Sequence, residues 1–506
     1  MGSLEENSPC GYPDASDPSL VLTHPTEAEK RQTWSMNHDE WGGSLSLEEY
    51  MEREPFLAST PLAANGAMTH WILTDSASPS SPGQKRRVLA SCETIRKPVL
   101  YVPAGGTEVQ EGYGYGIGSV YTPPEFRGRK YAARMLKDLG EVLRTWPAEE
   151  LRRQQEARGR GDTQGPGDGN ADADAADNHV KGEEQAPLKS FCSTLWSDIG
   201  KKYYATKGWP AFPSEHVEFP TLPVGTYPPA TSNADQLVYK IPHLAESGYS
   251  PIDLRSLDYY CREDEAQLRR QMIKHAQETG RAAFAYVPTP EVFHWHWARQ
   301  DFLSAREFPG RKSESSSGLA FSIGTRPPST PAPTPGEVKS ENYTSGAQSG
   351  NEVAIKIEGE DKEAVTKEED APVKRLRMWA IWARNYGKDA ANHPERNTLY
   401  ILRFVIDDGY SASPNINSST PGEPDRRVLQ AAFDTILDTA RRDAQRWNCG
   451  KVQLWNPDPL VRELAKATGL PHRFVDRDDS VPSLMWYRDE DESQIDWFAN
   501  EKFCWC

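Results

Sequence analysis

Apolar residues recur at helical spacing in two long segments of the chain. In the first segment they stand at Ala132, Met135, Leu136, Leu139 and Leu143. In the second they stand at Leu429, Ala432, Phe433, Ile436, Leu437, Ala440 and Ala444. Spacings of three and four place these side chains on one face of a helix, which can cover a sheet while the other face stays polar. The pattern therefore predicts two amphipathic helices.

Shorter apolar runs predict the strands of a first unit around the earlier helix. Strands are expected at residues 19–23, 69–73, 88–97, 113–122 and 191–196. Helices are expected at residues 26–36 and 46–53, and a short helix should end at Gly208, because glycine suits a helix C-cap. The predicted order is strand, helix, helix, three strands, helix, strand, short helix, strand.

A second block repeats the later part of that order. Its helices are expected at residues 254–278, 290–307 and 458–468, beside the amphipathic helix. Its strands are expected at residues 376–383, 397–406, 451–455 and 483–487. Both blocks then contain a strand, a long helix, a strand, a short helix and a strand, which indicates two copies of one α/β unit with a mixed sheet. We place the first unit at residues 19–225 and the second at residues 250–506.

Three segments contain too few large apolar residues to form a core. They are residues 1–18, an insertion at about 150–188 and an internal linker at about 310–371. Such segments cannot bury enough apolar surface to offset the entropy of the chain. We therefore expect all three to be disordered.

The overall composition narrows the possible functions. The chain of 506 residues is 37% hydrophobic and carries a net charge of −16, which argues against nonspecific binding to nucleic acid or to an anionic membrane. No apolar run approaches the roughly 20 residues of a membrane span, and the first residues lack a secretory pattern. Seven scattered cysteines indicate reduced thiols. These features predict a cytoplasmic protein.

One run of residues carries the clearest chemical signal. Residues 116–136 read GIGSVYTPPEFRGRKYAARML, in which a strand ends at Thr122, two prolines block further pairing, and a helix follows. The turn directs backbone N–H groups and the positive end of the helix at one spot, which suits a pyrophosphate. Gly128 lets the backbone approach closely. Positive charge comes from Arg127, Arg129 and Lys130. By itself the run also fits a basic surface turn before a helix.

The same run resembles motif A of the GNAT acetyltransferase superfamily, written Arg/Gln-x-x-Gly-x-Gly/Ala. Here the motif extends from Arg127 to Ala132, and Lys130 stands where the middle glycine is usual. The resemblance implies the GNAT acyl-CoA N-acyltransferase fold and acetyl-CoA as the cosubstrate. It implies a binding site formed by Val120, Tyr121, Thr122, Arg127, Gly128, Arg129, Lys130, Tyr131 and Ala132.

A second motif supplies a candidate acid. The run YYATKGW at residues 203–209 resembles GNAT motif B, in which a tyrosine four positions before a Gly-aromatic pair is the general acid for the leaving thiolate. Tyr204 fits that position and Tyr203 does not. The alternative for Tyr204 is a half-buried helix aromatic. The strand N–H near Val120 is the expected donor to the oxyanion.

Glu93 is the candidate base, acting directly or through water. A lysine amine has a pKa of about 10.4, so it must lose a proton before it attacks a thioester. The alternative for Glu93 is a solvated strand carboxylate or one that is paired with Arg96 or Lys97.

Cys192 and the pair His294 and His296 are the remaining candidates. Cys192 lacks a histidine near it in the sequence to activate it, which favours a buried core cysteine. Two histidines two positions apart point to different sides of a helix, which favours an aromatic cluster over a metal site. No metal is expected.

The layout as a whole resembles the fungal lysine N6-acetyltransferases of the Lyc type. The similarity rests on Cys92-Glu93, on the runs GSVYTPPEFRGRKYAARM, FCSTLWSDIGKKYYATKGW and YVPTPEVFHWHWAR, and on the segments VQLWNPDP and SLMWY. It implies a tandem of an active GNAT unit and a degenerate second unit. It further implies action on acetyl-CoA and free L-lysine in the cytosol, in lysine catabolism.

Other functions stay open from the sequence. They are acetylation of a protein lysine or a polyamine, and a degenerate protein that binds CoA or a partner.

The second unit lacks a phosphate turn before its long helix, so we expect it to complete a wall of the substrate cleft or to pack against the first unit. Its aromatic tail would anchor such an interface or fill a core through Trp497, Phe498, Phe503 and Trp505.

Overall fold

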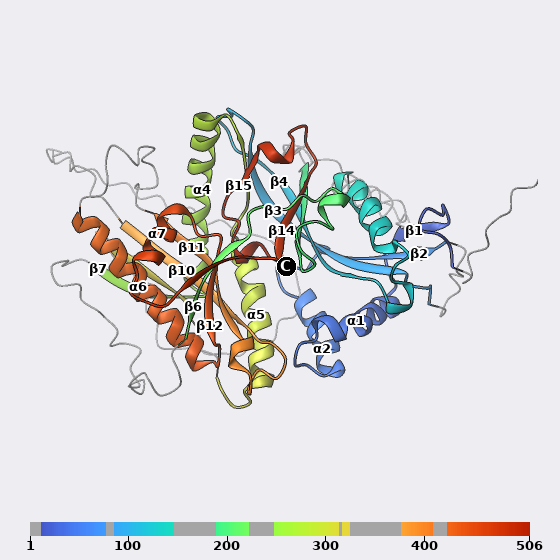
Figure 1. Ribbon diagram of the computed structural model, residues 1–506, viewed down its shortest axis with the longest axis horizontal. Helices are drawn as coiled ribbons and strands as arrows, with labels where there is room; N and C mark the ends of the chain where they lie inside the picture. Colours follow the sequence, from blue (N-terminus) through green and yellow to red (C-terminus); the bar gives the residue numbers. More distant parts are fainter. Residues whose placement is uncertain are drawn as a thin grey trace, which may run out of the picture.

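The computed structural model describes residues 12–76, 85–145, 189–221, 247–312, 316–323, 376–407 and 423–505. These residues form two mixed sheets that lie side by side, one built mainly from each half of the chain (Figure 1). The predicted α/β class with mixed sheets is confirmed. The insertion at about 150–188 and most of the linker at about 310–371 lie outside the described residues.

The first sheet has the strand order β1–β2–β3–β4–β5–β14, antiparallel except for the pair β4 and β5. β8 pairs with the end of β3, and β15 runs parallel to β8. The bounds are β1 Leu20–Thr23, β2 Met68–Asp75, β3 Ala90–Val102, β4 Gln110–Tyr121, β5 Lys189–Ser197, β8 Ala282–Tyr286, β14 Val481–Trp486 and β15 Ile495–Trp497.

The second sheet has the strand order β13–β6–β12–β11–β10–β9–β7, in which β11 and β12 are the parallel pair. The bounds are β6 Glu215–Pro220, β7 Ser247–Asp253, β9 Ser316–Ile323, β10 Leu376–Asn385, β11 Thr398–Asp407, β12 Lys451–Trp455 and β13 Arg473–Asp476. Each sheet therefore contains a parallel pair between antiparallel neighbours.

The two sheets exchange strands. β5, which runs parallel to β4, pairs on its other edge with β14 from the C-terminal block. Likewise β12, which runs parallel to β11, pairs on its other edge with β6 from the N-terminal block. The connections meet where the N–H of Phe212 donates to the Pro482 carbonyl. A boundary between residues 225 and 250 thus divides the sequence but not the sheets.

Helices cover the sheets with the faces that the periodicity predicts. The helix at 131–145 packs on the first sheet and α6 (Glu423–Arg446) on the second. The predicted apolar faces of both are buried, apart from the half-buried Ala132. The other helices are α1 Glu27–Trp41, α2 Leu47–Ala58, α4 Leu257–Thr279, α5 Pro290–Glu307 and α7 Pro459–Ala467. Short 3₁₀ turns are η1 Pro124–Phe126, η2 Ala205–Lys207, η4 Pro394–Arg396, η5 Glu492–Gln494 and η6 Lys502–Cys504. No helix in the described part of the chain combines the length and apolar character that a membrane crossing requires.

Two expectations are wrong over part of their length. Ser316–Ile323 falls in the predicted disordered linker but forms β9, because Ala320 and Phe321 are buried in a strand between β7 and β10. The short helix expected before Gly208 is the single 3₁₀ turn η2.

The N-terminal segment is also more ordered than expected from residue 12 onward. Residues 12–18 lie against the helix at 131–145. The Tyr131 hydroxyl donates to the Pro13 carbonyl at 2.6 Å, and Arg134 Nη1 donates to the Ala15 carbonyl at 3.0 Å. Backbone carbonyls, which every residue carries, hold this segment, so its polar side chains gave no signal of order.

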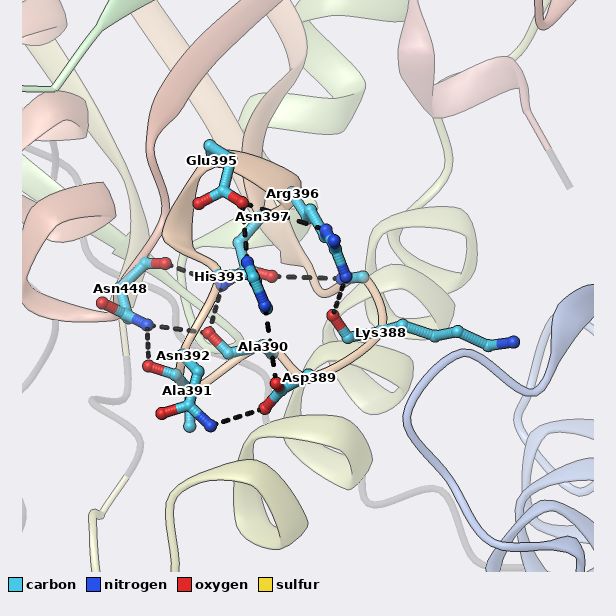
Figure 2. Close-up of polar contacts among 11 residues, drawn as sticks. Lys388, Asp389, Ala390, Ala391, Asn392, His393, Glu395, Arg396, Asn397 and Asn448 are labelled. Carbon is cyan, nitrogen blue, oxygen red and sulfur yellow. Dashed lines mark hydrogen bonds and ion pairs between the residues drawn. The ribbon is translucent and has the colours of Figure 1, made fainter.

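The buried amide of Asn397 and the half-buried amide of Asn448 fix the connection between β10 and β11 (Figure 2). Asn397 accepts from the Gly387 N–H at 3.1 Å and donates to the carbonyls of Ala390 and Asn448, both at 2.8 Å. Asn448 in turn donates to the Ala390 carbonyl at 2.7 Å. These bonds satisfy backbone groups of the loop, which begins after Asn385, the last residue of β10.

The strand exchange predicts that β14 stabilises the first unit. Leu484 of β14 is fully buried in the core that also holds Phe191 of β5. We expect Leu484→Ala to lower the free energy of unfolding by about 2–5 kcal/mol, through lost burial and a cavity. Urea unfolding measures the loss, and hydrogen exchange should show faster opening of the β5 amides.

Leu254→Ala is the matched control, since Leu254 is 58% exposed and its truncation should change stability by less than about 0.5 kcal/mol. Unchanged exchange in β5, with loss confined to β14, would contradict the shared role of that strand.

Candidate active site

A cavity of about 360 Å³ lies between the two units. One wall comes from α2, β3, β4 and β5 and from the segment around Tyr204. The other comes from α5, β10 and β11 and from the tail up to Trp505. Glu93 and Tyr204, the acid–base candidates from the sequence, both line this cavity. The second unit therefore forms one wall of this cavity.

Glu93 on β3 is held as a carboxylate. Its Oε1 accepts a hydrogen bond from the Ser119 hydroxyl, and its Oε2 lies 3.3 Å from His70 Nε2. Burial acts to raise the pKa of Glu93, but the nearby His70 ring and the Ser119 hydroxyl hold that pKa below its usual range. The group is thus ionised at neutral pH and can attract an ammonium or accept its proton.

The alternative ion pair of Glu93 with Arg96 or Lys97 does not form. Arg96 lies over the Tyr113 ring, with 4.9 Å from its guanidinium carbon to the ring centre. Lys97 is buried and donates from Nζ to the Cys504 carbonyl at 2.6 Å. Arg96 and Lys97 therefore have partners other than Glu93.

Tyr204 stands at the start of η2, the turn that ends at Gly208. Gly208 has a φ of +99°, which glycine adopts without strain, and the N–H of Trp209 donates to the Tyr204 carbonyl at 3.0 Å. Burial raises the pKa of Tyr204, so its phenol is protonated at neutral pH. Tyr203 is more exposed and does not line the cavity.

The cavity lies where β4 and β5 separate. Their pairing ends at Ile117 and Leu195, although β4 continues to Tyr121. At the same level the register between β3 and β4 shifts, and Ser119 has a φ of +51°. Such a bulge takes backbone groups out of the ladder and re-aims the strand. Val120, the expected oxyanion donor, follows the bulge and lines the cavity.

The turn before the helix at 131–145 has the geometry of an anion site. Gly128 and Lys130 have φ values of +81° and +66°, and nothing lies within 4 Å of a Cβ built on Gly128. Lys130 thus adopts the left-handed conformation that the usual glycine would take, at a cost of about 1–2 kcal/mol. Among the described residues, Thr122 Oγ1 beside the turn is buried without a hydrogen-bond partner. These features fit a phosphate group.

The other residues of the predicted cofactor site divide between surface and core. Arg127 donates from Nε to the Thr122 carbonyl at 3.1 Å and reaches Glu40 at 3.2 Å. The Arg129 guanidinium lies 5.2 Å from the Tyr12 ring centre. Tyr121 and Tyr131 are buried and Ala132 is half-buried.

The second-unit wall carries groups to which the sequence assigned no role in the active site. They are Trp295, His296, Arg299, Tyr400, Lys502 and Trp505. Burial lowers the pKa of His296 well below its ordinary value, so the ring is neutral. The run at 294–299 offered a partial signal, because an arginine follows its aromatic residues. Nothing in the sequence showed that this face meets Glu93.

Cys192 belongs to the core, as predicted. It is fully buried, and burial raises the pKa of its thiol, which leaves it unreactive. His296 packs against the rings of Trp295 and Trp505. Across the described ranges, no three His, Cys, Asp or Glu side chains gather as metal ligands.

These features together define a GNAT fold with a second GNAT-like unit, in which a splayed β4–β5 pair faces a cavity shared by both units. Residues 228–506 match the family model described as LYC1 GNAT-like C-terminal domain. This match covers more than half of the chain, so the protein belongs to that family.

Two curated relatives are similar to parts of the chain. A lysine acetyltransferase of Yarrowia lipolytica is 28% identical over 189 residues, which are 37% of this chain and 39% of that protein. An uncharacterized protein of Saccharomyces cerevisiae is 27% identical over 336 residues, which are 61% of this chain and 70% of that protein.

Solved structures align over most of the chain at low identity. A tandem GNAT protein from the clavulanic acid biosynthesis pathway aligns at 9% identity and a TM-score of 0.34, over 93% of this chain and 99% of its own. N-myristoyltransferase of Saccharomyces cerevisiae with bound myristoyl-CoA aligns at 10% identity and a TM-score of 0.40, over 97% of this chain and 86% of its own.

The left-handed turn makes a prediction about Lys130. A β-branched residue fits a positive φ poorly, so Lys130→Val should lower the free energy of unfolding by about 1–3 kcal/mol. Urea unfolding measures this change. Lys130→Gly should stay within about 1 kcal/mol of the wild type, because glycine accepts the conformation.

Lys137→Val is the control, since Lys137 is exposed on the following helix and should tolerate the change. Equal stability of Lys130→Val and Lys130→Gly would show that the turn is not constrained in this conformation.

Proposed function

We propose that the protein is an N-acetyltransferase that transfers the acetyl group of acetyl-CoA to a primary amine, the N6 amine of free L-lysine. The observation that carries this proposal is the convergence of Glu93 and Tyr204 on one cavity where β4 and β5 separate. Family membership and the lysine acetyltransferase among the relatives support the same activity.

The cosubstrate would lie along the end of β4 and at the turn that follows. Backbone N–H groups at the start of the helix at 131–145 would hold its diphosphate, with charge from Arg129 and Lys130. Thr122 Oγ1 offers a further polar contact. When bound, acetyl-CoA supplies a thioester whose carbonyl carbon can accept the amine.

The proton transfers fall to side chains of the chain itself. Glu93 takes a proton from the ammonium, directly or through water, and the neutral nitrogen then bonds to the carbonyl carbon. The backbone N–H at Val120 stabilises the oxyanion. Tyr204 gives its phenolic proton to the sulfur as the carbon–sulfur bond breaks, and the nitrogen passes its second proton to the Tyr204 phenolate, directly or through water. The products are an amide, free CoA thiol and the proton that Glu93 releases to solvent.

The cavity favours a small acceptor. Walls from both units bound about 360 Å³, whereas a peptide substrate needs an extended groove. Its lining includes the acids Glu54 and Glu93 and the bases Arg53 and Arg299. A mixture of both charges suits a free amino acid better than a polyamine, which carries positive charge alone.

We place the reaction in the cytoplasm, in lysine degradation. The cysteines of the described residues are free and buried, which suits a reducing compartment.

CoA release with acetyl-CoA should be measured against L-lysine, polyamines and lysine peptides. Turnover on peptides but not on L-lysine would refute the catabolic assignment, and no turnover on any amine would refute the enzyme.

Replacing the proposed acid should slow the chemical step. Tyr204→Phe removes the proton donor, so we expect kcat to fall by about 10²–10⁴-fold with little change in acetyl-CoA affinity. Steady-state kinetics and calorimetric binding measure the two quantities. Tyr203→Phe is the matched control, because its hydroxyl lies outside the cavity lining. Unchanged kcat in Tyr204→Phe would remove Tyr204 from the mechanism.

The pH profile should report the environment of Glu93. Glu93 acts as a carboxylate, and its pKa is below the usual range. The enzyme should therefore lose activity only when the pH falls through that low pKa and Glu93 becomes protonated. Ser119→Ala removes a hydrogen bond to the charged form. The pKa of Glu93 should therefore rise, and the acid limb of kcat/KM should move to higher pH.

Glu93→Gln is the control for that profile. It cannot titrate at this position, so the limb assigned to Glu93 should disappear and kcat should fall. An acid limb that stays in place in both variants would assign it to another group.

A further inference from the structure

Arg299 of α5 differs from the other cations that line the cavity. Its Nη1 donates to the amide oxygen of Asn385 at 2.5 Å, and its guanidinium carbon lies 5.7 Å from the centre of the Trp505 ring. Among the described residues it forms no ion pair with a carboxylate. Burial, and then the charge of Arg53, lower the pKa of Arg299 to about 10, so it remains a cation at neutral pH.

The neighbouring arginine is already neutralised. Arg53 donates from Nε and Nη2 to Glu54 Oε1 at 2.9 and 2.6 Å, and from Nη1 to the Trp41 carbonyl at 3.2 Å. Both side chains of this pair are largely buried. Arg53 and Glu54 thus form a closed pair beside Arg299.

Arg384 and Lys502 have partners of their own. Arg384 pairs with Asp443 at 3.2 Å and lies 4.1 Å from the centre of the Trp447 ring. Lys502 Nζ lies 3.6 Å from the centre of the Trp505 ring and 4.3 Å from that of Trp455. Arg299 is the cavity cation whose partner in the described structure is a neutral amide.

A guanidinium out of bulk water is costly unless an anion meets it. Its planar fork matches a carboxylate through two parallel hydrogen bonds, and an Asn amide beside it can donate to the same anion. Asn385 is held at the end of β10 by its pairing with Thr398, and the network of Asn397 and Asn448 fixes the loop that follows (Figure 2).

We propose that Arg299, together with Asn385, binds the α-carboxylate of the amino acid acceptor and so directs its side-chain amine toward Glu93. This inference rests on the proposed function and names the part of the cavity that selects the acceptor. Arg299 comes from the second unit and Glu93 from the first, and both line one cavity. The carboxylate and N6 amine of L-lysine likewise lie at opposite ends of the molecule.

A carboxylate subsite formed by Arg299 and Asn385 would distinguish amines that carry a free carboxylate from amines that do not. A free amino acid presents a carboxylate to Arg299, whereas 1,5-diaminopentane has the same chain without it. A lysine within a peptide has its carboxyl group in an amide bond. Arg299 is therefore a specificity-determining residue, and removing it should affect acceptors with a carboxylate selectively.

The test compares L-lysine with 1,5-diaminopentane in the wild type and in Arg299→Gln. For the wild type we expect kcat/KM to favour L-lysine by at least about 10-fold, the worth of one charge-assisted contact. In Arg299→Gln we expect kcat/KM for L-lysine to fall by about 10- to 100-fold, mainly through KM. The value for 1,5-diaminopentane should stay within about 3-fold of the wild type, less than such a contact contributes.

Arg306→Gln is the matched control. Arg306 lies on the same helix but pairs with Glu52 at 2.7 Å outside the cavity lining, so both acceptors should keep their wild-type kinetics. Arg299→Lys keeps the charge and loses the fork, and should give an intermediate KM for L-lysine. It also tests the inference should Arg299→Gln not fold, which thermal unfolding reports.

An unchanged ratio of the two acceptors in Arg299→Gln, or in Arg299→Lys, overturns the inference while the proposed function stands. If the wild type acetylates no amine, the proposed function fails. In that case the inference is tested without turnover, by calorimetric measurement of L-lysine binding with CoA present. L-lysine binding that is lost in Arg299→Gln but kept in Arg306→Gln supports it, and equal binding or none to the wild type overturns it.

Discussion

The pairing of β5 with β14 and of β12 with β6 is the constraint on which the rest of the structure depends. A strand at the edge of a sheet has a row of unpaired N–H and C=O groups that need partners. In both units the strand beyond the parallel pair comes from the other half of the chain. Neither sheet is complete alone, so the position of each unit relative to the other, and of the cavity between them, follows from backbone hydrogen bonds.

Buried charges then fix the tail that closes this cavity. Arg403 of β11 donates to Asp264 Oδ1 from Nη2 at 2.7 Å and also pairs with Glu501. Glu501 Oε2 accepts from the N–H of Phe404 at 2.8 Å. Because a buried charge that loses its partner is strongly destabilising, few other placements of this segment are possible. Trp505, four residues further on, is thereby directed to the cavity wall.

The sequence predicted the structure that residues close together in the chain determine, and little of the structure that depends on distant residues. The helices at 131–145 and in α6 follow from spacing, and the turn at Gly128 follows from the prolines and glycine between a strand and a helix. The exchange of β6 and β14 could not be predicted, because these pairings join residues more than two hundred positions apart. A short apolar run predicts a strand but does not indicate which other strand it pairs with. Arg299 was overlooked for the same reason: its importance depends on Asn385 and on the wall across from it.

Three unfavourable local arrangements gather around the cavity and the turn beside it. Ser119 and Lys130 have positive φ values, and the Arg299 guanidinium is matched only with an amide among the described residues. Sequences that otherwise agree with their fold tend to break local rules at functional sites, where a ligand repays the cost. A molecule with a diphosphate at one end, joined in the cavity by a carboxylate-bearing acceptor, would offset the charge at both the turn and Arg299. The unfavourable terms at the turn and at Arg299 thus lie where the proposed cosubstrate and acceptor would bind.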